Sequence, residues 1–135
     1  MSVGVLLITH GSLGSELLRI ATGIFGTCPT RADALEVEND APCDPLLEEA
    51  QRRVNGLDEG DGVLVLTDFY GSTPANLAVD LGQRHPRVRV LAGVNLPMLV
   101  RALSYASLDL DQTADKALQG GREGVLRCAP RPDEA

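Results

Sequence analysis

Four short runs rich in apolar residues recur along the chain, and apolar residues at helical spacing follow each of them. The runs cover residues 3–9, 32–37, 62–67 and 87–92. Runs of this length are typical of parallel strands that are buried on both faces. Polar residues interrupt the second run, so its pattern is the weakest. Stripes at helical spacing predict helices over residues 17–25, 46–54, 77–81, 98–103 and 110–118.

Three prolines indicate where helices begin. Asp44-Pro45 and Thr73-Pro74 each combine a residue that caps helix N-termini with a proline, which fits the first helical position. Pro97 predicts the start of a further helix. The second, third and fourth predicted helices therefore each follow their strand after a short connection.

The order of elements predicts the fold class. Strand and helix alternate four times, which favours right-handed crossovers and an α/β three-layer sandwich, with a four-stranded parallel sheet flanked by helices on both faces. Near the end of the chain, Gly120-Gly121 predicts a hinge or turn, and Gly124 to Cys128 a short fifth strand. We expect residues 1–129 to form one domain and residues 130–135 a disordered tail.

Composition excludes several classes of function. Among 135 residues, twelve basic against nineteen acidic ones give a formal net charge of -7, which argues against nucleic acid as a partner. The single lysine, Lys116, lies close to the C-terminus, so the chain has no Gly-Lys-Ser/Thr phosphate loop. The longest apolar runs are far shorter than the roughly 20 residues that cross a bilayer, so we expect no direct membrane insertion.

Cysteine usage indicates the cellular compartment. Cys28, Cys43 and Cys128 are odd in number and show no Cys-x-x-Cys spacing. The N-terminus lacks the basic region and the long apolar stretch of a secretion signal. Together these features predict a cytoplasmic protein with reduced thiols.

Three loops rich in small polar residues follow the first, third and fourth predicted strands. They are His10-Gly11-Ser12, the segment 68–73 and the segment 93–95. In parallel sheets, ligands bind outside the carboxyl ends of the strands, where helix N-termini also converge. We therefore expect the three loops to meet around the imidazole of His10 and the carboxylate of Asp68.

This pair of side chains fits nucleophilic attack by His10 on a phosphorus atom. Asp68 would accept a hydrogen bond from one ring nitrogen, which fixes the tautomer and stabilises the positive charge that develops. Backbone N–H groups and hydroxyls would hold the phosphoryl oxygens without a lysine. The candidate phosphoryl-binding residues are Gly11, Ser12, Gly71, Ser72, Thr73 and Asn95. This chemistry requires no metal and no cofactor.

Each of these residues also has an ordinary structural interpretation. A lone histidine after a strand is more often a local hydrogen-bonding residue, and an aspartate there is commonly a helix cap or turn former. The joint placement of His10 and Asp68 favours a functional site. His85 follows a predicted helix and precedes the fourth strand, at the opposite edge of the sheet, so we interpret it as structural.

Three segments carry a resemblance to a known family. They are Leu7 to Gly11 (LITHG), Leu66 to Asn76 (LTDFYGSTPAN) and Gly93 to Leu99 (GVNLPML), within a match that runs from Val5 to about Cys128. The chain resembles the enzyme IIA domain of the mannose family of the bacterial phosphoenolpyruvate-dependent sugar phosphotransferase system (PTS). The family commonly has a second glycine where this chain has Ser72.

The resemblance implies a phosphotransferase with a transient phosphohistidine. His10 would accept a phosphoryl group from the phosphocarrier protein HPr and pass it to a histidine of a IIB protein, with Asp68 orienting His10 and Thr73 supplying a hydroxyl. It also implies a homodimer in which the C-terminal strand, residues 124–128, crosses to the partner's sheet. Many relatives continue into a fused IIB domain. Because this chain ends at Ala135, we expect a separate IIB protein, and an association with the membrane components IIC and IID stays open.

Other functions remain open from the sequence. A tetrapyrrole metal chelatase also places His-Gly-Ser after its first strand, although a metal site calls for a second His or a Glu at the same edge. A regulatory module would keep the fold and sense phosphoryl flux without transport. The phosphotransfer subunit of dihydroxyacetone kinase shares the fold and the histidine, but the segment from Asn95 to Met98 favours the mannose type.

Overall fold

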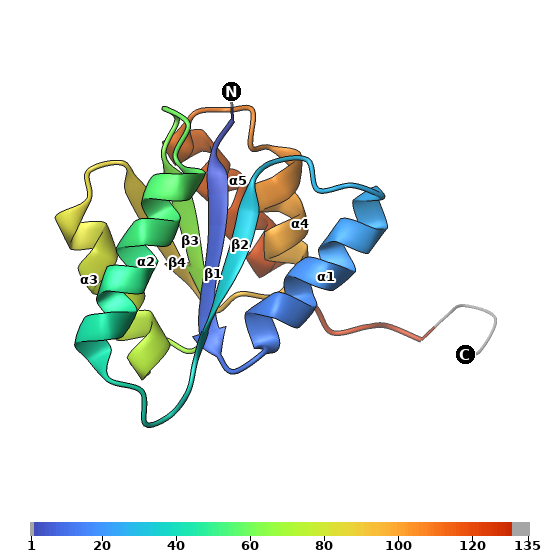
Figure 1. Ribbon diagram of the computed structural model, residues 1–135. Coiled ribbons are helices and arrows are strands. Elements are labelled where there is room, and N and C mark those ends of the chain that lie inside the picture. Colours follow the sequence, from blue (N-terminus) through green and yellow to red (C-terminus); the bar gives the residue numbers. More distant parts are fainter. Residues whose placement is uncertain (1, 131–135) are drawn as a thin grey trace.

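The computed structural model describes residues 2–130, and its centre is a four-stranded parallel sheet (Figure 1). The strands lie in the order β2-β1-β3-β4, and each neighbouring pair is parallel. Their bounds are β1 (Gly4–His10), β2 (Ala32–Val37), β3 (Val63–Thr67) and β4 (Val88–Ala92). The structure therefore confirms the four strands that the apolar runs predicted.

Five helices cover the two faces of the sheet, as expected for a three-layer α/β fold (Figure 1). On one face lie α1 (Leu13–Phe25), α4 (Leu96–Ser104) and α5 (Leu110–Glu123), and on the other α2 (Cys43–Leu57) and α3 (Thr73–Arg84). None of the helices in the described part of the chain is long and apolar enough to cross a lipid bilayer.

Burial on both faces explains the unbroken apolar pattern of β1. Val5 and Leu7 belong to the core cluster under α1, α4 and α5, whereas Leu6 and Ile8 belong to the cluster under α2 and α3. All four side chains are fully buried. Because neither face of this strand meets solvent, polar residues do not alternate with apolar ones.

The strand order places the carboxyl ends of β1 and β3 side by side in the middle of the sheet. From β1 the chain continues to β2 on one side, and from β3 to β4 on the other, so the order reverses between β1 and β3. Ile8 pairs with Thr67 in register, and the loops that carry His10 and Asp68 therefore leave the sheet together. Such a reversal is where open α/β sheets bind ligands.

Two predicted N-caps are wrong by one or two residues. Pro42 occupies the N-cap position of α2, so Asp44 lies inside the first turn. Ser72 caps α3 by accepting the N–H of Ala75, and Thr73 is the first helical residue. In both cases the earlier residue already has the extended backbone that an N-cap requires, with ψ of 135° at Pro42 and 171° at Ser72.

The predicted hinge at Gly120-Gly121 is also wrong, because both residues are buried inside α5. A Cβ on Gly120 would overlap Cγ of Arg101, and one on Gly121 would lie 2.8 Å from Cε of Met98. The two glycines thus let α5 approach α4 closely. Glycine lowers helix propensity by only about 1 kcal/mol relative to alanine, a cost that such packing offsets.

Residues 125–130 follow α5 outside any helix or strand of the single chain. Val125 and Leu126 are exposed, and Figure 1 shows the segment leading away from the domain. The predicted fifth strand does not form within one chain, and its pairing with a partner's sheet stays a prediction. Of the predicted tail, residues 131–135 lie outside the described residues.

We predict that Gly120→Ala destabilises the fold, although alanine favours helices. Its Cβ would displace Arg101, and overpacking of this kind lowers the free energy of unfolding by about 1–3 kcal/mol. Gly23→Ala in α1 is the matched control, because a Cβ there meets no atom within 4 Å and should raise this free energy by up to about 1 kcal/mol. Urea unfolding measures both, and equal stability of the two variants would contradict the close packing of α4 on α5.

Candidate functional site

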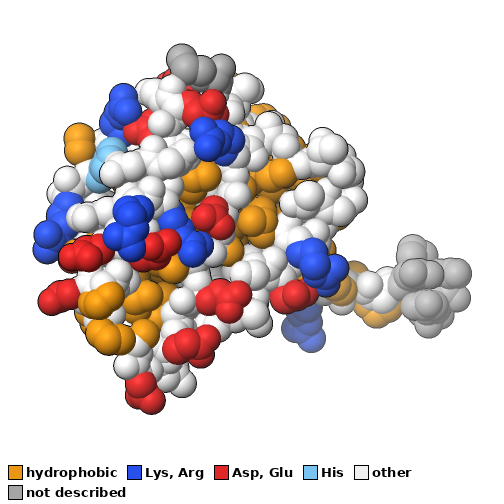
Figure 2. Space-filling view, viewed as in Figure 1, with side chains coloured by type: hydrophobic (Ala, Val, Ile, Leu, Met, Phe, Trp, Pro, Cys, Tyr) orange, Lys and Arg blue, Asp and Glu red, His pale blue; other side chains and the backbone are white. Residues whose placement is uncertain are grey.

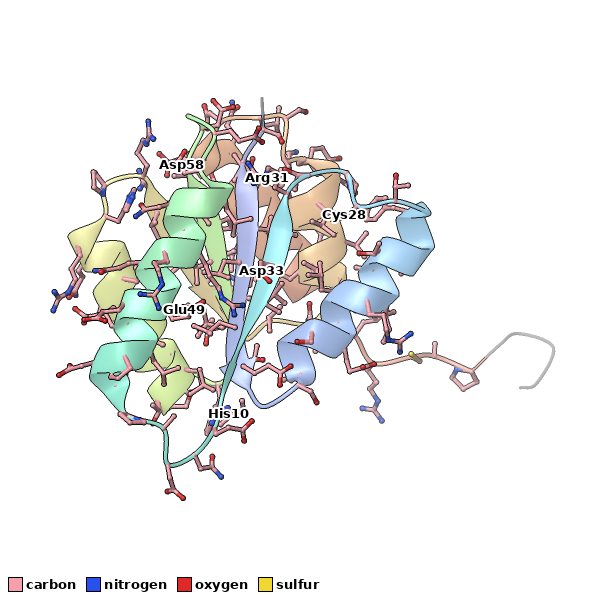
Figure 3. All side chains as sticks on the ribbon, viewed as in Figure 1. His10, Cys28, Arg31, Asp33, Glu49 and Asp58 are labelled. Atoms are coloured by element: carbon pink, nitrogen blue, oxygen red, sulfur yellow. The ribbon has the colours of Figure 1, made fainter. Side chains whose placement is uncertain are left out.

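The carboxylate of Asp68, directly after β3, holds His10 at the end of β1. Its Oδ2 accepts the backbone N–H of His10 at 2.9 Å and lies 2.8 Å from Nδ1 of the ring. Its Oδ1 accepts the N–H of Phe69 at 2.8 Å. One carboxylate therefore fixes both the backbone and the ring of His10. Figure 3 shows His10 at the end of the sheet opposite Cys28 and Asp58.

These hydrogen bonds decide the charge of Asp68. Burial raises the pKa of the carboxyl, since only 9% of the side chain is exposed. The hydrogen bonds from the N–H and the ring of His10 and from the N–H of Phe69 together outweigh burial, so the pKa of Asp68 lies below its ordinary value. Asp68 is therefore ionised at neutral pH and only accepts hydrogen bonds.

The charge of Asp68 in turn decides the tautomer of His10. An ionised carboxylate has no proton to give, so the hydrogen between Oδ2 and Nδ1 belongs to the ring. In a neutral imidazole the free lone pair is then on Nε2. Because 41% of the His10 side chain is exposed, the ring is accessible from outside the protein.

The start of α1 lies directly after His10. Gly11, with φ of +48°, turns the chain from β1 towards α1 and donates its N–H to a carbonyl of β2 at 3.0 Å. Ser12 occupies the N-cap position, but its side chain makes no capping hydrogen bond. Instead, Oγ1 of Thr9 caps the helix by accepting the N–H of Gly14 at 2.7 Å. The exposed hydroxyl of Ser12 is therefore not needed to begin the helix.

The loop between β3 and α3 is held together by Ser72. Its N–H and its Oγ both donate to the carbonyl of Phe69, at 3.0 and 2.5 Å, and Oγ accepts the N–H of Ala75 at 3.5 Å. Gly71 has φ of +89°, a conformation that residues with side chains rarely adopt. Ser72 thus has a structural task, whereas Thr73 is exposed at the first position of α3.

Asn95 is engaged with two helices rather than with His10. Its Oδ1 accepts the N–H of Met98 at 2.9 Å, and its Nδ2 donates to the carbonyl of Gly121 at 3.0 Å. It lines a surface hollow of about 540 Å³ that Val125 also lines. Both ends of the Asn95 amide are therefore engaged within the fold, and its contact with a phosphoryl group stays a prediction.

The second histidine lies at the other edge of the sheet. His85 follows α3, and its Nδ1 accepts the N–H of Arg87 at 3.2 Å. Its place in a local turn agrees with the structural interpretation. Within residues 2–130, no group of three or more His, Cys, Asp or Glu side chains is placed to hold a metal ion.

An exposed aromatic pair at this edge escaped the sequence analysis. Phe69 and Tyr70, next to Asp68, are exposed over 73% and 77% of their surface. The chain has only four Phe and Tyr residues, so two neighbouring ones in a short polar loop were an available signal. Exposed aromatic side chains beside a reactive group are typical of surfaces that meet another protein.

The carboxyl edge of the sheet is also acidic. Residues 32–51 form β2, the loop after it and the first turns of α2, and they contain no Lys or Arg. Glu36, Glu38, Asp40 and Asp44 lie between the end of β2 and the first turn of α2, and Glu48 lies further along α2. Asp33, near the start of β2, and Glu49 form ion pairs with Arg52 or Arg53. Figure 2 shows acidic side chains at its lowest part, where the strands of Figure 1 end. Such an edge repels small anions and attracts basic protein surfaces.

Comparison with known proteins gives a consistent picture. A family model described as PTS system fructose IIA component (EIIA-man) matches residues 4–118. The PTS system mannose-specific EIIAB component of Escherichia coli (strain K12) is 32% identical over 138 residues, which covers 99% of this chain and 42% of that protein. The chain thus spans less than half the length of this relative. The PTS system fructose-specific EIIA component of Bacillus subtilis (strain 168) is 29% identical over 102 residues, 76% of this chain and 69% of that protein.

Solved structures share the fold over nearly the whole chain. The mannose/sorbose specific IIA subunit of the phosphotransferase system from Enterococcus faecalis superposes with a TM-score of 0.85 at 25% identity, covering 97% of this chain and 98% of that one. The phosphotransferase system component EIIA from Streptococcus agalactiae gives a TM-score of 0.81 at 24% identity, covering 94% and 97% of the two chains. The second likeness shows the fold alone.

We predict that the stabilising effect of Asp68 disappears in acid. Because its folded pKa is lowered, its contribution is complete above the unfolded value, near 3.8, and is lost as the pH falls through the folded pKa. Asp68→Asn should cost about 2 kcal/mol of unfolding free energy at pH 7, the size of hydrogen bonds to a charged group. Urea unfolding from pH 7 to about 2.5 should show this difference shrinking below about pH 4.

The His10→Ala background is the control for this titration. It removes the ring as a donor and leaves the backbone N–H groups of His10 and Phe69 on the carboxylate. The effect of Asp68→Asn should therefore be smaller in that background, and it should disappear at a higher pH, because the pKa of Asp68 is lowered less without the ring. A stability difference between the wild type and the Asp68→Asn variant that stays constant throughout the acid range would contradict the lowered pKa.

Proposed function

The chain belongs to the family of PTS fructose and mannose IIA components, and from this membership we propose that it is a phosphoryl carrier in which His10 is the acceptor. The observation that supports this proposal most directly is the Asp68 carboxylate on Nδ1 of His10, at 2.8 Å. That contact directs the free lone pair of the ring to Nε2. The chain would act as a phosphotransferase with a transient phosphohistidine, in carbohydrate uptake or its regulation.

The proposed step is a direct transfer of the phosphoryl group. The lone pair of Nε2 forms the N–P bond while the bond between phosphorus and the donor breaks, and its electron pair returns to the donor. The His10 ring keeps its hydrogen on Nδ1 and so becomes positively charged. The ionised Asp68, whose oxygen accepts that hydrogen, stabilises this charge. Transfer to the next protein reverses the same step.

Two helix N-termini would hold the phosphoryl oxygens. α1 begins three residues after His10, and α3 begins five residues after Asp68, so N–H groups without intrahelical partners converge from both faces of the sheet. The exposed hydroxyls of Ser12 and Thr73 are the best-placed side chains to add hydrogen bonds. Gly11, Gly71 and Ser72 would shape the two loops around the group.

We propose HPr as the donor and a IIB protein as the acceptor. The name of the E. coli relative, EIIAB, places a IIA and a IIB component in one protein, and this chain aligns with less than half of it. The exposed Phe69 and Tyr70 beside His10 and the acidic residues of segment 32–51 suit a partner with an apolar, basic surface. Residues 1–129 would form the IIA domain, which would associate with the membrane components IIC and IID.

We also propose that two chains form a homodimer by exchanging the segment after α5. Val125 and Leu126 are exposed over 76% and 69% of their surface, which leaves two apolar side chains without cover in the single chain. Val125 also lines the hollow beside the carboxyl end of β4, at the free edge of the sheet. A partner's segment 124–128, added along that edge, would cover the hollow and would bury its own Val125 and Leu126.

Phosphorylation by phosphoenolpyruvate, enzyme I and HPr tests the carrier. We expect one phosphoryl group per chain, bound by a linkage that is stable in alkali and labile in acid, as a phosphohistidine is. His10→Ala should abolish the label, because no other side chain in the described part of the chain presents an imidazole at this edge. His85→Ala is the matched control and should be labelled like the wild type.

The same assay tests the role of Asp68. Asp68→Ala should remain folded and be labelled at least about tenfold more slowly, because the ring loses the partner that orients it. A label that survives His10→Ala would remove His10 from the mechanism. An unchanged rate in Asp68→Ala would do the same for Asp68.

Light scattering tests the exchanged dimer. At micromolar concentration we expect twice the chain mass of 14.3 kDa. Val125→Asp combined with Leu126→Asp should return the protein to a monomer, because charge replaces the apolar side chains that the partner would bury. A wild-type protein that scatters as a monomer would refute strand exchange.

A further inference from the structure

The two outer strands of the sheet, β2 and β4, each have one side that pairs with no other strand. Such edges expose N–H and C=O groups that can pair with a strand of another chain. Figure 1 looks onto the β2 edge, with α1 and α2 on either side of the strand. Two surface hollows of about 540 and 360 Å³ border β2 beside α1, and Asp33 lines both. The β2 edge is therefore open to approach from outside.

The hydrogen bonds between β1 and β2 show which backbone groups of β2 face outward. The N–H of Val5 on β1 donates to the carbonyl of Arg31, directly before β2. Because backbone groups alternate between the two sides of a strand, the residues with odd numbers in β2 turn their N–H and C=O groups towards β1. Ala34, near the middle of β2, therefore presents both of its backbone groups on the outer side.

Two charged side chains occupy both outward groups of Ala34. Oδ1 of Asp33 accepts its N–H at 2.8 Å, and Nη1 of Arg53 on α2 donates to its C=O at 2.6 Å. The same Nη1 lies 3.4 Å from Oδ2 of Asp33, and Nε of Arg53 donates to Oε1 of Glu49 at 2.9 Å. Figure 3 labels Asp33 on β2 and Glu49 on the neighbouring α2. We call Asp33 and Arg53 the edge clamp, because together they cover the pairing groups in the middle of the strand.

Stability alone does not explain this arrangement. Ion pairs between partly exposed side chains contribute little to the free energy of unfolding. The neighbouring Arg52 shows the ordinary case: its Nη2 pairs with Glu49 at 2.6 Å within α2. Arg53 shares that partner but also reaches across to the backbone of β2. The distinctive contact of the edge clamp is therefore the one with the free strand edge.

The carboxyl half of the other edge, on β4, has no such cover. The N–H of Val63 on β3 donates to the carbonyl of Arg87, so by the same alternation Val90 and Ala92 face outward. Within residues 2–130, no side chain forms a hydrogen bond with the outward backbone groups of these two residues. Ala92 also lines the hollow that Val125 lines. The two edges of the sheet thus differ in whether another strand can pair with them.

We propose that the edge clamp decides through which edge of its sheet the chain meets a second copy: it closes β2 to strand addition and leaves β4 to the partner's segment. A chain that accepted strands at both edges would form open-ended assemblies, whereas one accepting edge gives a closed dimer. Without the clamp, two β2 edges would pair antiparallel about a twofold axis. The statement about β4 rests on the homodimer proposed above, while the closure of β2 stands without it.

Light scattering over a range of concentrations tests the closure. Asp33→Ala combined with Arg53→Ala frees both outward groups of Ala34, and we expect about twice the mass of the wild type as the concentration rises. Glu48→Ala combined with Arg52→Ala is the matched control. It also removes one acid and one base, but neither residue has a hydrogen bond with β2 among the described residues, so the mass should equal that of the wild type.

Proline at the outward position provides the rescue. Ala34→Pro, added to the variant without the clamp, removes the outward N–H and is compatible with an edge strand, so it should return the mass to the wild-type value. Urea unfolding checks that each variant is folded, and the midpoint should stay close to that of the wild type. If the variant without the clamp does not fold, Arg53→Ala alone frees the C=O of Ala34 and should raise the mass at higher concentration.

Four outcomes would count against the inference. A wild-type mass throughout the concentration range, in the variant without the clamp, would show that the clamp does not close β2. An equal increase in the Glu48 and Arg52 control would assign the effect to lost surface charge. An increase that Ala34→Pro leaves unchanged would place the new contact elsewhere. A wild-type chain that scatters as a monomer would overturn the exchange at β4 alone, because the closure of β2 is measured relative to the wild type.

Discussion

The pairing of β1 with β3 is the constraint on which the site depends. Their register brings the ends of the two strands side by side. The backbone N–H of His10 lies beyond the last paired residues of β1 and β3, and it donates to the Asp68 carboxylate instead of a strand carbonyl. The same oxygen then reaches the ring. A shift of one residue in either strand would turn His10 to the opposite face of the sheet and separate the pair. The orientation of the His10 ring therefore depends on the register of β1 and β3.

Much of this arrangement could be predicted because it follows from short-range pattern and from topology. Unbroken apolar runs of strand length identified β1 and β3, and parallel strands necessarily end at the same edge. That rule was enough to predict that His10 lies near Asp68 and that His85 lies at the other edge of the sheet. The bond from the His10 N–H to Asp68 was not predictable, because it depends on the register of the two strands.

What the sequence did not show has a different cause. Residues far apart in the sequence take up the hydrogen bonds and the space beside these side chains. Gly120 and Gly121 looked like a hinge because glycine weakens helices, but Arg101 and Met98 on α4 fill the space beside them. Asn95 stays a predicted phosphoryl-binding residue, but its amide also joins the start of α4 to α5, which the sequence did not show. A sequence shows which groups a side chain offers, and only the packed chain shows which of them are already used.

The charge distribution suits the proposed function, in which the site would both accept and release a phosphoryl group. The positive charge nearest the proposed phosphoryl group would be the His10 ring itself, which Asp68 stabilises, while the oxygens meet N–H groups and hydroxyls. Helix N-termini stabilise an anion by only about 0.3–1 kcal/mol each at exposed sites. The negative charge of segment 32–51 would further weaken the binding of an anion. A lysine or arginine clamp would hold the group more firmly and slow its departure. In the proposed function, weak contacts to the oxygens together with an oriented ring would allow the group to leave as well as to arrive.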